Sequence, residues 1–308
     1  MNMGSFSSSH PSLPWSFAAV DPQETKLEDC RVVVLPVPYD ATTSYKGGAR
    51  EGPKAIIDAS RYLEDYDIEL EREIYRVGIH TLQELETHVG GPEDMTKRVE
   101  AAVGPFAQKG QLLAVLGGEH SISVGAVKAL REVNDDLSVL YLDAHGDLRD
   151  SYMGSKFSHG CTARRIWEMC DLVEVGVRSV SQEEMSFIKE ERLKVYFHGE
   201  GSRMASWDVE GILGGLSKTV YISIDLDVFD PGLMSAVGTP EPGGMTWEQV
   251  LGLLKVVCNE RSVVGFDVTE LCPQVGPSSC AFVAAKLAYK VIGYATGQDV
   301  LTLGPTTP

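Results

Sequence analysis

The chain alternates short apolar runs with amphipathic stretches from residue 31 to residue 295, and this alternation constrains the fold most strongly. Short apolar runs between polar residues are typical of buried strands, whereas longer stretches with apolar residues every three or four positions are typical of helices. Strands are predicted at 31–37, 74–80, 112–116, 137–142, 172–177, 193–197, 219–224 and 262–266. Helices are predicted after Pro53 and at 92–108, 123–133, 158–170, 181–191, 205–216, 246–258 and 279–294. The pattern predicts an α/β fold: a single-domain, three-layer α/β/α structure with a mostly parallel sheet of about eight strands.

The same pattern predicts the domain organisation. Within residues 29–308 there is no internal linker rich in Pro, Gly or Ser and no repeat, so we predict one domain over this range. Residues 1–28 are rich in Ser and Pro and offer Trp15 and Phe17 as aromatic anchors. We predict that this N-terminal segment is partly flexible at its tip and then packs on the body.

The acidic composition argues against several classes of partner. Asp and Glu number 44 against 27 Lys and Arg, which gives a formal net charge of -17. Nucleic acid is an unsuitable partner, because binding a phosphate backbone requires clustered positive charge. An acidic surface favours a small cationic substrate only mildly, through its electrostatic field.

Cysteine usage and hydropathy indicate the compartment. The 6 cysteines are scattered without a Cys-x-x-Cys pair, so a disulfide framework is not expected and a reducing cytoplasm is the simplest setting. The N-terminus lacks the basic start and apolar segment of a signal peptide. No run approaches the ~20 apolar residues that a membrane-spanning helix needs, so we expect no membrane association.

The stretch VLYLDAHGDLRD, residues 139–150, is the first candidate for chemistry. Asp143, His145 and Asp147 occupy alternate positions directly after the predicted strand, where parallel sheets commonly place their sites. The alternative is an ordinary polar turn in which a neighbouring carboxylate satisfies the histidine.

Two further strand ends carry similar residues. In SIDLDVFDP, Asp225 and Asp227 are two positions apart, so both side chains point to the same face of the strand. Paired buried carboxylates are unfavourable unless a cation or a proton lies between them, although a helix cap or turn would also explain them. In GGEHS, the glycines Gly117 and Gly118 permit a tight turn or a close backbone approach and bring His120 to the same sheet edge. Alone, GGEHS would be an ordinary connection from strand to helix.

Together the three motifs predict a binuclear metal site. They supply two histidines and four carboxylates, a mixed nitrogen and oxygen set for two divalent cations. Hard metals such as Mn²⁺ suit this set, whereas zinc sites more often use Cys or more His.

At these residues the sequence resembles the ureohydrolase family, the arginase and agmatinase group of binuclear manganese enzymes. GGEHS at 117–121, DAHGD at 143–147, SHG at 158–160 and SIDLDVFDP at 223–231 stand in the order and spacing of that family. The resemblance covers about residues 31–295 and implies an arginase-like fold with two Mn²⁺ per subunit.

The resemblance implies a role for each matching residue. One metal would be held by His120, Asp143, Asp147 and Asp225, and the other by Asp143, His145, Asp225 and Asp227, with Asp143 and Asp225 bridging. His159 in SHG matches the histidine that shuttles protons, and Glu270 in FDVTELCP matches the carboxylate that orients the guanidinium. Taken without the other motifs, His159 would be a residue at a helix start and Glu270 a surface charge.

The resemblance also implies a substrate class, a small cationic guanidino compound hydrolysed to urea and an amine. Loop 148–158 joins the metal motif to His159 and is expected to meet the far end of the substrate. Arginases are expected to carry Ser and Asn just before that histidine, whereas Lys156, Phe157 and Ser158 stand here, so agmatine is the expected substrate. The alternatives are aminopropylagmatine, guanidinobutyrate or arginine, a deacetylase-like amidohydrolase with a single zinc, and a non-catalytic scaffold. The family further suggests a homo-oligomer, a trimer or a hexamer.

Overall fold

The computed structural model describes residues 13–23, 25–199 and 208–297, and its main feature is one eight-stranded sheet. The strands run parallel in the order β4-β1-β5-β10-β9-β6-β7-β8. Their bounds are β1 Val32–Val37, β4 Ile79–Thr81, β5 Leu112–Gly117, β6 Leu137–Leu142, β7 Asp171–Val175, β8 Lys194–Tyr196, β9 Thr219–Asp225 and β10 Ser262–Thr269. Two further strands, β2 Tyr66–Asp67 and β3 Arg72–Glu73, form a separate antiparallel ribbon that the sequence did not indicate.

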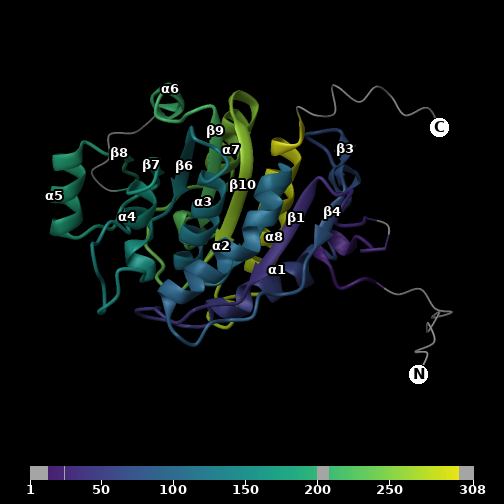
Figure 1. Cartoon of the computed structure of the whole chain (residues 1–308), viewed down its shortest axis with the longest axis horizontal. Coiled ribbons are helices and arrows are strands. Elements are labelled where there is room, and N and C mark those ends of the chain that lie inside the picture. Colours follow the sequence, from purple (N-terminus) through teal and green to yellow (C-terminus); the bar gives the residue numbers. More distant parts are fainter. Residues whose placement is uncertain (1–12, 24, 200–207, 298–308) are drawn as a thin grey trace.

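Helices cover both faces of this sheet, and the strands in Figure 1 lie between α2 and α3 on one side and α7 and α8 on the other. One buried cluster joins the sheet to α1, α6, α7 and α8, and the other joins it to α2, α3, α4 and α5. The bounds are α1 Gly52–Ser60, α2 Pro92–Lys109, α3 Ser123–Arg131, α4 Thr162–Trp167, α5 Gln182–Glu191, α6 Val209–Leu213, α7 Trp247–Glu260 and α8 Ser279–Ala295. The predicted α/β class, the parallel sheet and the strand number are therefore confirmed.

The alternation of side chains along each strand explains the two apolar layers. In β5, Leu112, Ala114 and Leu116 belong to one cluster, whereas Leu113 and Val115 belong to the other. Since successive side chains of a strand point to opposite faces, a strand buried on both faces is a continuous apolar run. This is why these strands are recognisable in the sequence.

One predicted strand is partly wrong. Within the predicted strand 74–80, residues Ile74–Val77 form a short 3-10 helix, and the strand β4 begins only at Ile79. Gly78 separates the two elements with a φ of 83°, a backbone conformation that residues other than glycine rarely adopt. The chain therefore turns at Gly78 before it enters the sheet.

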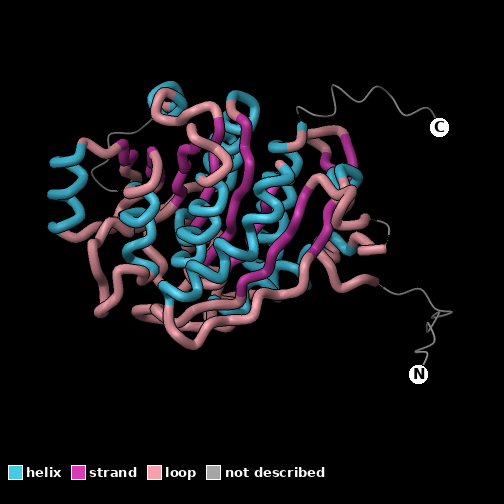
Figure 2. The backbone as a smooth tube through the Cα atoms, in the orientation of Figure 1, coloured by secondary structure: helices cyan, strands magenta, loops and turns pink. Residues whose placement is uncertain are grey.

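Loops at the carboxyl ends of the strands form the edge that matters for function, and Figure 2 shows them gathered along the lower edge of the sheet. Two of these loops are in close contact. A Cβ atom added to Gly118 would lie only 2.0 Å from the backbone oxygen of Tyr39. The predicted close backbone approach at GGEHS is thus confirmed, and it brings the loop after β1 against the loop after β5.

Of the N-terminal segment, residues 1–12 and residue 24 lie outside the described residues, including the tip that we predicted to be flexible. Phe17 is buried, and the indole of Trp15 donates a hydrogen bond to Asp58 of α1. Among the described residues, no helix combines the length and apolar character needed to cross a membrane.

Candidate metal centre and active site

Four neighbouring strands carry the predicted site residues to one edge of the sheet. The strands β5, β10, β9 and β6 are consecutive in the sheet order, so their carboxyl ends lie side by side. They present His120 after β5, Glu270 after β10, Asp225 and Asp227 at the end of β9, and Asp143, His145 and Asp147 after β6. Motifs more than 100 residues apart in the chain thus meet at one place.

Asp143 lies between the two histidines. Its Oδ2 atom is 3.0 Å from Nδ1 of His120, and its Oδ1 atom is 3.5 Å from Nδ1 of His145. It belongs to both groups of potential metal donors. One group is His120, Asp143 and Asp147, and the other is Asp143, His145 and Asp227. In each group the ligand atoms lie within 4.8 Å of one another. The position of Asp143 is therefore that of a side chain able to bridge two cations.

The carboxylates on β9 flank this pair of sites. Asp227 Oδ2 is 3.0 Å from Nδ1 of His145, and Asp225 Oδ2 is 3.3 Å from Nδ1 of His120. The other oxygen of Asp225 accepts a hydrogen bond from the Asp227 backbone, and Asp225 belongs to neither of the two donor groups. A bridging role for Asp225 remains a prediction.

The electrostatics of the cluster fit divalent cations. Burial raises the pKa of Asp147 and of Asp225 well above the ordinary value, and neighbouring carboxylates add to both shifts. Among the described residues, the ion-pair partners of the four carboxylates are His120 and His145 alone. Four buried carboxylates without lysine or arginine are unfavourable unless cations compensate them. Oxygen and imidazole donors are also what Mn²⁺ accepts, so the residues present suit two divalent metals.

His120 is held so that Nδ1 faces the carboxylates. Its Nε2 atom lies 2.8 Å from Oγ of Ser223, which in turn donates to Asp267 at 2.9 Å. The ring also stacks on Tyr141 with centroids 4.5 Å apart. Such partners fix the orientation of a ligating histidine. The sequence motifs did not indicate Tyr141, Ser223 and Asp267 as site residues. For Tyr141 and Ser223 the signal was the alternate spacing, because they precede Asp143 and Asp225 by two positions in their strands.

His159 lies at the start of the short helix η5, His159–Cys161, at the wall of the site. Its ring nitrogens contact hydroxyls of the loop after β1: Nδ1 is 3.2 Å from Thr42 Oγ1, and Nε2 is 3.3 Å from Ser44 Oγ. Burial lowers the pKa of His159 to about 4. Thr42 and Ser44 were not predicted as site residues, although they stand in a long loop at a strand end.

Glu270 follows β10 and is largely buried. Its Oε1 atom accepts a hydrogen bond from the His120 backbone at 2.7 Å, and burial together with the nearby Glu119 raises its pKa to about 8. Its backbone has a φ of 64°, and Asp147 has a φ of 47°. Non-glycine residues in this region are strained and concentrate at functional sites.

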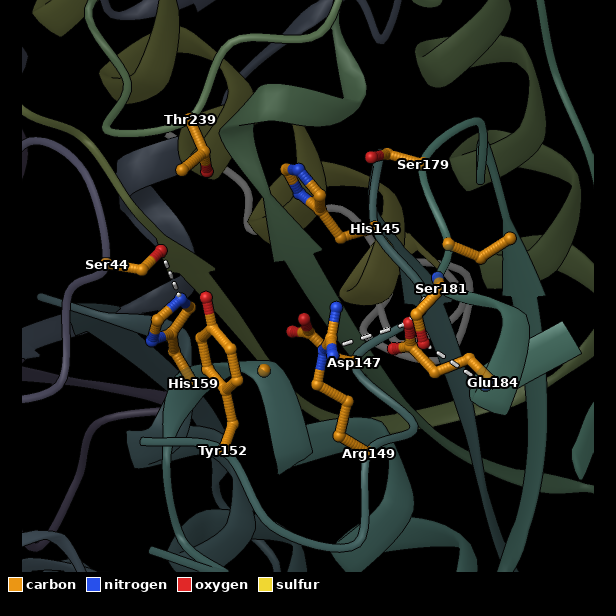
Figure 3. Close-up of a pocket in the computed structure, with 12 residues that line it drawn as sticks. Ser44, His145, Asp147, Arg149, Tyr152, His159, Ser179, Ser181, Glu184 and Thr239 are labelled. Carbon is orange, nitrogen blue, oxygen red and sulfur yellow. Dashed lines mark hydrogen bonds and ion pairs between the residues drawn. The ribbon is translucent and has the colours of Figure 1, made fainter. Parts of the chain in front are cut away.

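A pocket of about 200 Å³ opens onto the metal centre (Figure 3). His145, Asp147 and His159 line it, together with Arg149 and Tyr152 from loop 148–158. The remaining lining residues are Ser44, Gly160, Ser179, Val180, Ser181, Glu184 and Thr239. The carboxylate of Glu184 accepts hydrogen bonds from the backbones of Ser181 and Leu148.

Comparison with known proteins agrees with this geometry. Residues 30–293 match the arginase family. An N(1)-aminopropylagmatine ureohydrolase from Synechocystis sp. is 38% identical over 277 residues, which cover 88% of this chain and 90% of that protein. An agmatinase from Pyrococcus horikoshii is 36% identical over 273 residues, which cover 87% of this chain and 93% of that protein.

The fold comparison gives the same result. The crystal structure of an agmatine ureohydrolase of Thermoplasma volcanium superposes with a TM-score of 0.82 at 32% identity, over 90% of this chain and 93% of that one. The family implies a binuclear metal site, in accord with the two donor groups described above. The chain therefore belongs to the arginase family, and it is a ureohydrolase, a hydrolase that acts on linear amidines.

Proposed function

We propose that the chain hydrolyses a guanidine whose other end is an amine, with agmatine as first candidate and putrescine and urea as products. The lining of the pocket carries this proposal. Apart from the proposed metal ligand Asp147, the lining contains one carboxylate, that of Glu184, and one Lys or Arg among its described residues, Arg149. The Arg149 guanidinium lies 4.8 Å from the Tyr152 ring, and its Nε lies 3.9 Å from the Glu184 carboxylate. With its arginine engaged in this way, the pocket suits an amine better than the α-carboxylate of arginine.

N(1)-aminopropylagmatine is the second candidate. Relatives bearing that name, from Synechocystis sp. and Thermus thermophilus, are 38% identical to this chain. Both candidates share the guanidinium and carry positive charge beyond it, and they differ in the length of the amine arm. The chemistry proposed at the metal centre is the same for both.

We propose two Mn²⁺ ions per subunit, held by His120, Asp143, Asp147, Asp225, His145 and Asp227. Such ions lower the pKa of water towards ~7 and so provide a nucleophile strong enough for a resonance-stabilised guanidinium. The oxygen-rich donor set favours Mn²⁺ over zinc.

Glu270 and His159 are proposed to act on the substrate. One oxygen of Glu270 accepts a hydrogen bond from the His120 backbone, and the other, which has no hydrogen-bond partner among the described residues, is proposed to accept N–H donors of the guanidinium. Gly238 lies beside this oxygen, and a Cβ atom added to Gly238 would still be 3.9 Å from Glu270 Oε2. His159 lines the pocket, where it can protonate the amine that leaves as the C–N bond breaks.

Release of urea tests the proposal directly. The Mn²⁺-loaded protein would be assayed with agmatine, N(1)-aminopropylagmatine, guanidinobutyrate and arginine at equal concentrations. We expect kcat/KM to be highest for one of the two amine-terminated compounds and lowest for the two carboxylates. Preference for arginine or guanidinobutyrate would contradict the proposed role of the pocket, and a metal count of one zinc per chain would contradict the proposed cofactor.

We also propose a cytoplasmic homo-oligomer, a trimer or a hexamer, as the family resemblance implies. The scattered cysteines support the cytoplasmic setting, since no disulfide joins any two of the six in the part of the chain that the structure describes. Light scattering on the purified protein would give the oligomeric state.

A further inference from the structure

Thr42, on the loop after β1, makes contacts that bear on the proton chemistry of His159. Its backbone N–H donates to Glu119 Oε2 at 2.6 Å, and its hydroxyl donates to Glu119 Oε1 at 2.7 Å. The same hydroxyl oxygen accepts the backbone N–H of His159 at 2.9 Å and lies 3.2 Å from the Nδ1 atom of that residue. One hydroxyl thus joins a buried carboxylate to both the backbone and the ring of His159.

The hydrogen count of this hydroxyl determines the state of the ring. A threonine hydroxyl has one hydrogen and two lone pairs. When Glu119 is ionised it can only accept, so the hydrogen of Thr42 points to it. The Thr42 oxygen can then only accept from His159, and Nδ1 carries a hydrogen. Ser158 Oγ, at 3.4 Å from Nδ1, can accept from the same N–H. In the neutral ring the lone pair then lies on Nε2.

The Nε2 atom lies on the pocket side. Its neighbour at 3.3 Å is the hydroxyl of Ser44, and Ser44 and His159 both line the pocket (Figure 3). With Nδ1 protonated, Nε2 is the atom that can receive a proton from water in the pocket. The ring then carries N–H on both nitrogens, keeps its contact with Thr42, and returns to neutral when Nε2 gives that proton to the leaving amine.

We propose that Thr42 is a positioning residue that holds His159 in the Nδ1–H tautomer and so fixes Nε2 as its proton-exchanging atom. This inference rests on the proposed role of His159. In the opposite tautomer, the lone pair of Nδ1 would face the Thr42 oxygen without a hydrogen between them, and Nε2 could accept no proton. A ring free to adopt both tautomers spends part of its time unable to react.

Thr42→Val tests the inference, because it removes the hydroxyl and keeps the branched shape of the side chain. With the metal-loaded enzyme we expect kcat to fall about 10- to 100-fold, a share of what a positioned acid or base contributes, with KM changed less than about threefold. Thr42→Ser retains the hydroxyl and is expected to recover most of kcat. Thr43→Val, on the same loop, is the matched control and should leave kcat unchanged.

Nitrogen-15 spectra of histidine-labelled protein give a readout that does not depend on turnover. The His159 signals, identified by their loss in His159→Asn, should show the Nδ1–H form in the wild type and a mixture of tautomers in Thr42→Val. An unchanged tautomer, or a fall in kcat that follows a loss of metal, would overturn the inference. Failure of the proposed function would look different, because the wild type itself would then release no urea from any of the guanidines.

Discussion

At the scale of single residues, Asp143 is the side chain on which both halves of the candidate metal centre depend. Both of its oxygens face a histidine, and the side chain is fully buried. We expect Asp143→Ala to lose its bound metal and its activity to fall at least about 10³-fold, because removing a bridging ligand disrupts two metal sites at once. Metal content by plasma emission spectroscopy and urea release would be measured together. Normal metal content with normal turnover would refute the bridging position.

Glu270 should separate substrate binding from metal binding. Glu270→Gln keeps the shape of the side chain and its contact with the His120 backbone, but it removes the charge that would face the guanidinium. We expect metal content to stay at the wild-type level while kcat/KM falls by at least about tenfold. Loss of metal in this variant would mean that Glu270 supports the metal centre instead.

Glu174 on β7 is a buried carboxyl outside the proposed chemistry. Neither of its oxygens has a hydrogen-bond partner among the described residues, and burial, with Asp143 and Asp147 nearby, raises its pKa well above the ordinary value. An acid with a raised pKa in the folded state binds a proton that the unfolded chain has released. Its contribution to stability is therefore lost as pH rises above the unfolded pKa of about 4.3.

Glu174→Gln should remove this loss of stability at high pH, because glutamine does not ionise. We expect little change in the free energy of unfolding at pH 5 and a gain over the wild type at pH 8, measured by urea denaturation of the metal-loaded protein. Glu183→Gln, an exposed carboxylate on α5, serves as control and should change neither value. Equal effects of Glu174→Gln at both pH values would show that Glu174 is ionised throughout.

At the scale of elements, the close contact between α2 and α3 depends on one glycine. A Cβ atom on Gly125 of α3 would lie 2.3 Å from the backbone oxygen of Thr96 in α2. Such an approach forces the two helices apart, so we expect Gly125→Ala to destabilise the protein by about 1–3 kcal/mol.

The matched control is Gly252→Ala on α7. Gly252 is exposed, and its added Cβ would meet nothing within 4 Å. A helix gains roughly 0.5–1 kcal/mol when such a glycine becomes alanine, so this variant should be more stable. Thermal unfolding of both variants would show opposite signs, and a destabilised Gly252→Ala would contradict the packing explanation.

At the scale of the whole molecule, the metal centre should control how stability depends on pH. Without metal, burial raises the pKa of Asp147 and Asp225, whereas contacts with carboxylates raise the pKa of His120 and His145 against the opposing effect of burial. All four groups then bind protons more tightly when folded than when unfolded. Their contribution to stability is present below the unfolded pKa and is lost as pH rises.

We therefore expect the chelated protein to lose stability between pH 6 and pH 9, across the titration of histidine at about 6.5 in the unfolded chain. Bound metal displaces these protons and stabilises the fold by mass action, so the Mn²⁺-loaded protein should be more stable and less dependent on pH. Thermal unfolding with EDTA and with Mn²⁺ at both pH values would test this. Parallel curves for the two forms would contradict it.

The sequence by itself determined the fold class, the parallel sheet and the residues that the structure gathers into two groups of potential metal donors. A strand buried on both faces must be apolar throughout, and donors directly after such strands stand out against it, as Asp143 and Asp225 do. The predicted strand 74–80 was partly wrong, because the backbone conformation at Gly78 decides where β4 begins.

The tertiary structure alone decided which strand ends meet and what surrounds them. β10 lies between β5 and β9 although it comes last in the chain, and this order places Glu270 beside His120. The same holds for Thr42, which is 117 residues from His159 in the sequence and in contact with it in the fold. Such contacts leave no local signal, because they arise from packing between distant segments and not from the propensity of either one.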